Sequence, residues 1–181
     1  MRTTAFAFAL VASCATLAAE LESRQLTHYI PQNDLETIVR KEDWTEVPLA
    51  VKGGVLKGDT VRVWAGGLID RGNGDQPGEN VNGADGYREP TRLGGEQVTF
   101  ALSSDPTNTY ALLFKTESAG PVKCVPPGKP LEIKLTKDNE RLWVGFNDER
   151  GRYLDNHLGK GRRHELDPFW VRIEVVRIIV D

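Results

Sequence analysis

One loop of the chain carries oxygen-bearing side chains on both sides of a turn. Two carboxylates and two amides stand close together there: Asn147, Asp148, Asp155 and Asn156. Gly151 lies between the two pairs and permits the backbone to reverse, so that both pairs can face one point. Calcium takes about 6 to 8 oxygen ligands from carboxylates, carbonyls and water, and this set suits it. An ordinary solvated turn is the alternative, because Asp and Asn side chains commonly hydrogen-bond to their own backbone.

The same carboxylates also allow a glycosidase, in which an acid pair cleaves a glycosidic bond. Asp148 would then act with Glu149 or Asp155. Neighbouring carboxylates in a loop are more often cation ligands or surface charge. The chain contains no Gly-x-Ser-x-Gly nucleophile motif, no phosphate-binding Gly-Lys-Ser/Thr sequence and no Gly-x-Gly-x-x-Gly dinucleotide motif. We therefore predict a binding protein and not an enzyme.

A zinc site is a further alternative for the residues around the loop. His157 and His164 follow it, and Cys124 lies upstream. Their spacing fits no closed zinc motif, so we do not expect zinc. Without Cys14 in the N-terminal segment, Cys124 has no partner for an intrachain disulfide. The formal net charge of -3 gives no case for a nucleic-acid partner.

The elements that must position this loop are strands. The strand candidates are residues 60 to 65, 110 to 115, 131 to 135, 142 to 146 and 169 to 176. Several short strands separated by Gly, Pro, Asn and Asp, with no sustained helix, predict an all-β protein. The expected architecture is an antiparallel β-sandwich of the jelly-roll or galactose-binding type. Its long loops, 70 to 95 and 147 to 167, exceed the usual length of a connection and are expected to carry the function.

The strand pattern also assigns faces to the tryptophans. Trp64 and Trp170 fall opposite the strongest apolar alternation, where aromatic rings can stack on sugars. Trp143 is expected to be buried. In the last strand Arg172 and Glu174 share one face, and the opposite face is apolar: Phe169, Val171, Ile173 and Val175.

The N-terminus predicts export. Residues 1 to 19 combine Arg2, a short apolar run and the small pair Ala18-Ala19, which is the pattern of a signal peptide. The apolar run is shorter than the roughly 20 residues that cross a bilayer, so no membrane span is expected. Val11-Ala12-Ser13-Cys14 also resembles a bacterial lipobox, which makes a lipid anchor at Cys14 the alternative to cleavage near Ala18-Ala19. Either way we expect a secreted, periplasmic or cell-surface protein.

Residues 20 to 45 form a polar leader, and residues 46 to 181 form the predicted sandwich domain. Within the leader, apolar residues at helical spacing follow Asn33 and Asp34: Leu35, Ile38 and Val39. This spacing predicts one short amphipathic helix.

The loop residues also carry a family resemblance. The segment Asn147-Asp148-x-x-Gly151-x-Tyr153-x-Asp155-Asn156, followed by Gly159 and a terminal strand, resembles the calcium loop of PA-I-type galactophilic bacterial lectins. Upstream, Gly58-Asp59, an alternating strand and Ala65-Gly66-Gly67 resemble the strand that leads into the same site. The resemblance spans roughly residues 44 to 176 and is most specific at Gly58 to Gly72 and Asn147 to Asn156.

The resemblance implies a set of ligands. Asp148, Asp155 and Asn156 would bind calcium through their side chains, and Arg152 and Arg71 through their main-chain carbonyls. In such lectins two neighbouring sugar hydroxyls replace water on the ion, and the liganding side chains accept hydrogen bonds from the same hydroxyls.

Three departures from the family pattern bear on the sugar. Asp155 stands where the family typically has asparagine, which adds negative charge beside the ion. Glu89 stands where a family histidine contacts sugar, although a carboxylate can still accept sugar hydroxyls. The segment Lys160 to His164 is absent from the family and could cover or extend the site. The resemblance therefore predicts the calcium site and the sandwich more strongly than galactose.

The resulting prediction is a calcium-dependent lectin that binds galactose or a related glycan, with Ca²⁺ as its cofactor. The sugar-binding residues would be Asp148, Asp155, Asn156 and Glu89. A homo-oligomer is expected by analogy, because multivalency raises avidity by roughly 10² to 10⁴. The alternative is a calcium-stabilised extracytoplasmic interaction domain that has no sugar pocket.

Overall fold

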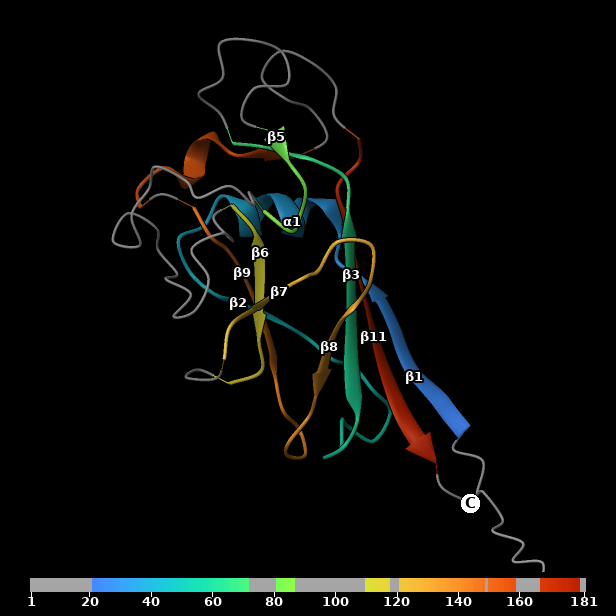
Figure 1. The fold of residues 1–181 in the computed structure, drawn as a ribbon. Helices are drawn as coiled ribbons and strands as arrows, with labels where there is room; N and C mark the ends of the chain where they lie inside the picture. The colour runs from blue at the N-terminus through green and yellow to red at the C-terminus, as the bar shows by residue number, and fades with distance from the viewer. Residues whose placement is uncertain are drawn as a thin grey trace, which may run out of the picture.

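The computed structural model describes residues 21–71, 81–86, 110–117, 121–148, 150–158 and 167–179. These residues form three antiparallel sheets and one short α-helix, so the predicted all-β, sandwich-like class is confirmed. In Figure 1 two four-stranded sheets form the body, and the helix and the smallest sheet lie across one end.

The first sheet has the order β1 (Leu21–Tyr29), β11 (Trp170–Ile179), β3 (Thr60–Gly66), β8 (Leu131–Lys134). The second has the order β2 (Thr45–Val47), β9 (Leu142–Phe146), β6 (Leu112–Lys115), β7 (Lys123–Cys124). The small sheet has the order β10 (His157–Leu158), β4 (Ile69–Asp70), β5 (Val81–Asn82). The helix α1 (Gln32–Val39) and a short 3₁₀ turn, η2 (Tyr153–Asp155), complete the described elements.

One apolar core fills the space between the two large sheets. The alternation along β3, β8 and β11 turns one set of side chains inward: Val61, Val63, Leu131, Ile133, Val171, Ile173 and Val175. The second sheet contributes Leu112, Phe114, Val144 and Phe146 to the same cluster. Burying each such side chain contributes about 1.5–3 kcal/mol, and this core holds the sandwich together. Trp143, for which burial is expected, is only half-buried.

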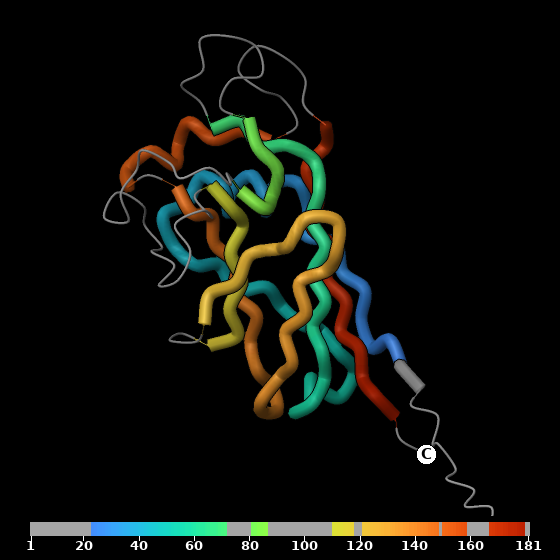
Figure 2. Tube along the Cα trace, in the orientation of Figure 1, coloured from blue at the N-terminus to red at the C-terminus, as the bar shows by residue number. Residues whose placement is uncertain are grey.

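The leader is part of the sandwich. The predicted helix is confirmed as α1, whose Leu35, Ile38 and Val39 are buried. The polar segment before it, for which no strand is predicted, forms β1 and pairs with β11 along its length. Figure 2 shows this N-terminal strand, in blue, beside the C-terminal strand in red. No described helix has the length and apolar character that crossing a bilayer requires.

A partly buried ion pair ties the end of β11 to the turn that precedes β3. Arg177 donates from Nε and Nη2 to the two carboxylate oxygens of Asp59, at 2.7 Å each. Asp59 is buried and also accepts a hydrogen bond from the backbone N–H of Leu56 at 2.8 Å. These hydrogen bonds, that from Arg177 above all, lower the pKa of the Asp59 carboxyl. Two segments more than a hundred residues apart are thereby held together.

Candidate functional site

The loop that follows β9 returns its oxygen-bearing residues to one place. Asn147 and Asp148 are buried at the end of β9, and Asn156 is fully buried where β10 begins. Between them the chain turns at Gly151, whose φ of 78° is the left-handed conformation that glycine adopts without steric cost. The reversal expected from the sequence is therefore present in the backbone.

Asn156 and Asp148 are in direct contact. The Nδ2 atom of Asn156 donates to Oδ2 of Asp148 at 2.7 Å and to the main-chain carbonyl of Val39 at 2.8 Å. Both partners are acceptors, so the amide has only one chemically reasonable orientation. Its Oδ1 is buried and has no hydrogen-bond partner among the residues that the structure describes. A buried, unsatisfied amide oxygen costs about 1–3 kcal/mol, which a bound cation would offset.

Tyr153 holds the two arms of the loop together. Its hydroxyl accepts from the backbone N–H of Asp148 at 3.2 Å and lies 3.4 Å from that residue's carbonyl, to which it can donate. The main-chain N–H of Asn156 donates to the carbonyl of Tyr153 at 3.3 Å. Because Tyr153 is itself buried, these contacts fix the backbone of Asp148 on one arm of the loop and that of Asn156 on the other.

The other predicted ligands lie on elements next to this pair in the chain or in the small sheet. In the small sheet His157 pairs with Asp70, so the main chain of Arg71 follows directly beyond that pair, toward Asn156. The guanidinium of Arg71 lies over the ring of Tyr110, 4.2 Å from its centroid, which directs that side chain to the ring. Asp155 is half-buried in η2, and Arg152 is exposed just before it. Glu89 and the segment from Lys160 to His164 lie outside the described residues.

The donor set fits a calcium ion by its chemistry. It offers two carboxylates, one amide oxygen and two main-chain carbonyls, all of them hard oxygen ligands, and leaves positions for water. Among the described residues no three His, Cys, Asp or Glu side chains lie together in a metal-binding group. A cation here would therefore depend on the buried amide oxygen of Asn156 and on the main chain as much as on Asp148 and Asp155.

The helix α1 covers this loop, and no feature of the sequence predicts that contact. Glu36 accepts from the backbone N–H of Leu158 through Oε2 at 3.0 Å, and its Oε1 lies 3.8 Å from Nδ1 of His157. Arg40 donates to the carbonyl of Leu154 at 3.0 Å. His157 thus faces a helix carboxylate, while Cys124, its suggested zinc partner, lies on β7 in the second sheet. Glu36 occupies the polar side of an amphipathic helix, where the sequence offers no signal of a role.

A second buried amide, Asn82 on β5, is also missed by the sequence. Its Nδ2 donates to the carbonyls of Tyr110 at 2.8 Å and Gly83 at 2.7 Å, while its Oδ1 has no partner in the described part of the chain. The backbone N–H of Tyr110 in turn donates to the Asn147 carbonyl, and the Asn147 N–H donates to the carbonyl of the neighbouring Ala111. Asn82 therefore stabilises the start of the loop through Tyr110, which contacts both residues. Its only signal is the density of Asn and Gly between residues 70 and 95.

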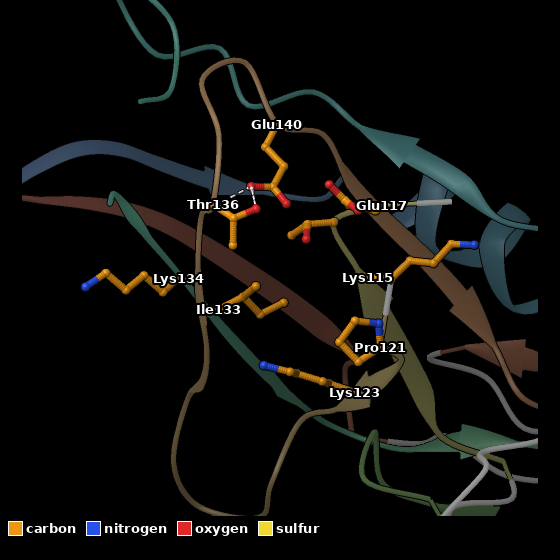
Figure 3. Close-up of a pocket in the computed structure, with 9 residues that line it drawn as sticks. Lys115, Glu117, Pro121, Lys123, Ile133, Lys134, Thr136 and Glu140 are labelled. Carbon is orange, nitrogen blue, oxygen red and sulfur yellow. Dashed lines mark hydrogen bonds between the residues drawn. The ribbon is translucent and has the colours of Figure 1, made fainter. Parts of the chain in front are cut away.

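A separate cavity of about 230 Å³ opens between β6, β7 and β8 (Figure 3). Lys115 and Lys134 line it but extend away from its centre, to opposite sides. The carboxylate of Glu140 accepts from the backbone N–H groups of Thr136 at 2.6 Å and Lys137 at 3.3 Å. Since Lys115 and Lys134 diverge and this carboxylate already accepts hydrogen bonds within a turn, the cavity offers less to a ligand than the loop does.

The chain matches no model of a known protein family and no curated protein sequence. The resemblance of residues 44 to 176 to PA-I-type lectins therefore remains a prediction, made from the segments Gly58 to Gly72 and Asn147 to Asn156.

Proposed function

We propose that this protein is an exported, calcium-dependent carbohydrate-binding protein. One observation carries the proposal: the buried Oδ1 of Asn156 has no hydrogen-bond partner among the described residues, although the amide lies beside the carboxylate of Asp148. Proteins rarely leave such an oxygen unsatisfied, and a cation is the partner that the neighbouring carboxylates favour. The lectin resemblance supplies the reason to expect a sugar on that ion.

Asp148, Asp155 and Asn156 would hold the ion through side-chain oxygens, and Arg71 and Arg152 through carbonyls. When bound, calcium supplies open coordination positions at which neighbouring sugar hydroxyls can replace water. The carboxylates of Asp148 and Asp155 accept hydrogen bonds from those hydroxyls and so orient the ring. Val39 and Asp148 keep the Asn156 amide from turning its nitrogen toward the ion. No covalent bond changes, so no general acid, base or nucleophile is needed.

Glu89 and the glycan class remain part of the proposal. A carboxylate at position 89 can accept sugar hydroxyls where the family has histidine, and galactose or a related glycan is the expected ligand. Export follows from the signal-like residues 1 to 19.

The test is a glycan array read with calcium and again with a chelator, together with a melting curve under both conditions. We expect calcium to raise the melting temperature and to be required for binding to at least one glycan. Asp148→Asn should remove both effects, whereas the exposed control Asp167→Asn should leave both unchanged. A melting temperature that calcium does not change, with an array equally blank in both conditions, would disprove the proposal.

The second candidate is a calcium-stabilised interaction domain without a sugar site. The observation that favours it is the set of hydrogen bonds between α1 and the loop at Asn156, Leu158 and Leu154. Through these bonds an ion in the loop would also stabilise the leader. Its signature is calcium-dependent melting with a blank array.

A further inference from the structure

The outer face of the first sheet, turned away from the core, carries three aromatic side chains. Tyr29 on β1, Arg172 on β11 and Trp64 on β3 are paired across the sheet in one row. Trp170 lies two residues from Arg172 on the same face of β11, opposite Gly66. It is therefore a diagonal neighbour of both Tyr29 and Trp64, at about 7–8 Å. We call these four residues, Tyr29, Trp64, Trp170 and Arg172, the aromatic platform.

Trp170 lies flat on the sheet. A Cβ atom built on Gly66 would come within 2.8 Å of the indole ring, so the ring rests directly on the Gly66 backbone. The side chain nevertheless remains 42% exposed, and Tyr29 is 57% exposed. Gly66 leaves room for the indole of Trp170 on the surface of the sheet, and Tyr29 is exposed to water two strands away. Both aromatic side chains therefore stay accessible to a ligand.

Arg172 supplies the platform with a fixed guanidinium. It stacks on the ring of Trp64, 4.2 Å from the centroid. Its Nε lies 3.7 Å from the buried carboxylate of Glu174, which Arg24 also approaches at 3.7 Å. Stacked guanidinium groups keep N–H donors that suit a carboxylate, because arginine is weakly hydrated and presents its donors in a plane.

The charges beside the platform are predominantly positive. On the outer face, the rows of paired residues that cross β11 at Trp170, Arg172, Glu174 and Val176 are counted together. These rows carry four cations and two anions: Arg24, Arg62, Lys134 and Arg172, and Glu132 and Glu174. The local net charge is therefore +2, although the whole chain is -3. Such a surface complements a ligand of moderate negative charge. The two carboxylates within it weaken it as a surface for a phosphate backbone, whose affinity depends on dense cationic contacts.

We propose that the aromatic platform binds an acidic polysaccharide, whose sugar rings stack on Trp170 and Tyr29 and whose carboxylates meet Arg172 and its cationic neighbours. The surface is formed by three adjacent strands, β1, β11 and β3, so it suits an extended chain better than a compact ligand. Binding there does not use the loop from Asn147 to Asn156, and it does not require calcium. It is therefore a second glycan surface, independent of the proposed lectin site.

The test is affinity electrophoresis of the full chain in gels containing polygalacturonate, with a chelator present throughout. We expect polygalacturonate to retard the protein, while neutral dextran and polyglutamate do not. Trp170→Ala should weaken binding by about tenfold or more and Trp170→Phe by less, and Arg172→Gln should weaken it and reduce its salt dependence. Leu154→Ala is the matched control, because Leu154 is an exposed apolar residue, 73% accessible, in another element.

Melting curves would show whether each variant is folded. If Trp170→Ala does not fold, Trp170→Phe and Arg172→Gln decide the outcome. The proposal is overturned if polygalacturonate does not retard the protein. It is also overturned if polyglutamate retards the protein equally, since the aromatic platform would then be a surface for negative charge in general or for a protein partner. Retardation equal to wild type in the folded platform variants overturns it as well. Because all arms contain chelator, these results are separate from success or failure of the calcium site.

Discussion

The side-chain amide of Asn156 donates to Oδ2 of Asp148 at 2.7 Å and, with its second hydrogen, to the carbonyl of Val39 in α1 at 2.8 Å. These two bonds join the return arm of the loop to its outgoing arm and to the leader. They also determine which atom of the amide is left for a ligand. The loop, the helix and the candidate ion site therefore depend on one side chain.

Replacing this amide by a carboxylate tests that dependence. In Asn156→Asp the new carboxylate faces the Asp148 carboxylate and the Val39 carbonyl without a hydrogen to donate, so chelated protein should lose about 2–4 kcal/mol of unfolding free energy. Calcium should restore part of the loss, because an added carboxylate is a good ligand. Urea unfolding with calcium and with chelator measures both effects. Asn33→Asp, an exposed amide in α1, should change little, and equal losses in the two variants would contradict the assigned role.

The contact between α1 and the loop gives a second prediction. Glu36→Ala removes the acceptor of the Leu158 N–H and should destabilise the protein by about 1 kcal/mol, or about 2–4 °C in melting temperature. Hydrogen exchange at the Leu158 amide should become faster while the amides of β9 stay protected. Thr37→Ala, on the exposed side of the same helix, is the control for helix stability. Unchanged exchange at Leu158 would show that the helix does not hold the loop.

The pair of Asp59 and Arg177 predicts a pH dependence. The pKa of Asp59 is lowered in the folded protein, so its stabilisation is present above the ordinary carboxyl pKa of about 3.9 and is lost as the pH falls through the lower folded value. Asp59→Asn should therefore cost about 2–4 kcal/mol near pH 7, and the difference from wild type should shrink below about pH 4. Urea unfolding from pH 7 down to pH 2.5 measures this.

Glu132→Gln is the control for that series. Glu132 pairs with Arg62 at 2.8 Å, but its side chain is exposed, so its loss should cost less than about 1 kcal/mol at any pH. A difference between wild type and Asp59→Asn that stays constant down to the lowest pH would contradict the assignment.

Two glycines with the same φ allow the cost of a left-handed backbone conformation to be separated from the cost of a steric clash. Gly67 and Gly53 both have φ of 82°. A Cβ on Gly67 would lie 2.1 Å from the carbonyl oxygen of Pro168, whereas one on Gly53 would meet nothing within 4 Å. Gly53→Ala should cost about 1 kcal/mol and Gly67→Ala clearly more, about 3 kcal/mol or above, as measured by denaturant unfolding. Similar costs for the two variants would show that the turn between β3 and β4 can shift to accommodate the added methyl group.

Much of the sandwich follows from local pattern. The strand predicted at residues 142 to 146 is β9 with the same bounds, and the alternating segments at 60 to 65 and 131 to 135 lie in β3 and β8 within a residue. Such strands are predictable because side chains alternate between faces with a period of two wherever one face meets a core. The helix at Leu35, Ile38 and Val39 is predictable for the same reason at helical spacing.

The sequence alone also determined that the loop from Asn147 to Asn156 holds carboxylates and amides around a glycine, because that is a matter of composition over a short span. Only the tertiary structure decided what those groups contact. The polar segment of β1 is a strand because β11 offers it a partner, which no local period reveals. The orientation of the Asn156 amide, whose oxygen has no partner in the described part of the chain, likewise results from Val39, 117 positions away, accepting one amide hydrogen while Asp148 accepts the other. Hydrogen bonding across such separations depends on how the elements pack, and packing is a property of the whole chain.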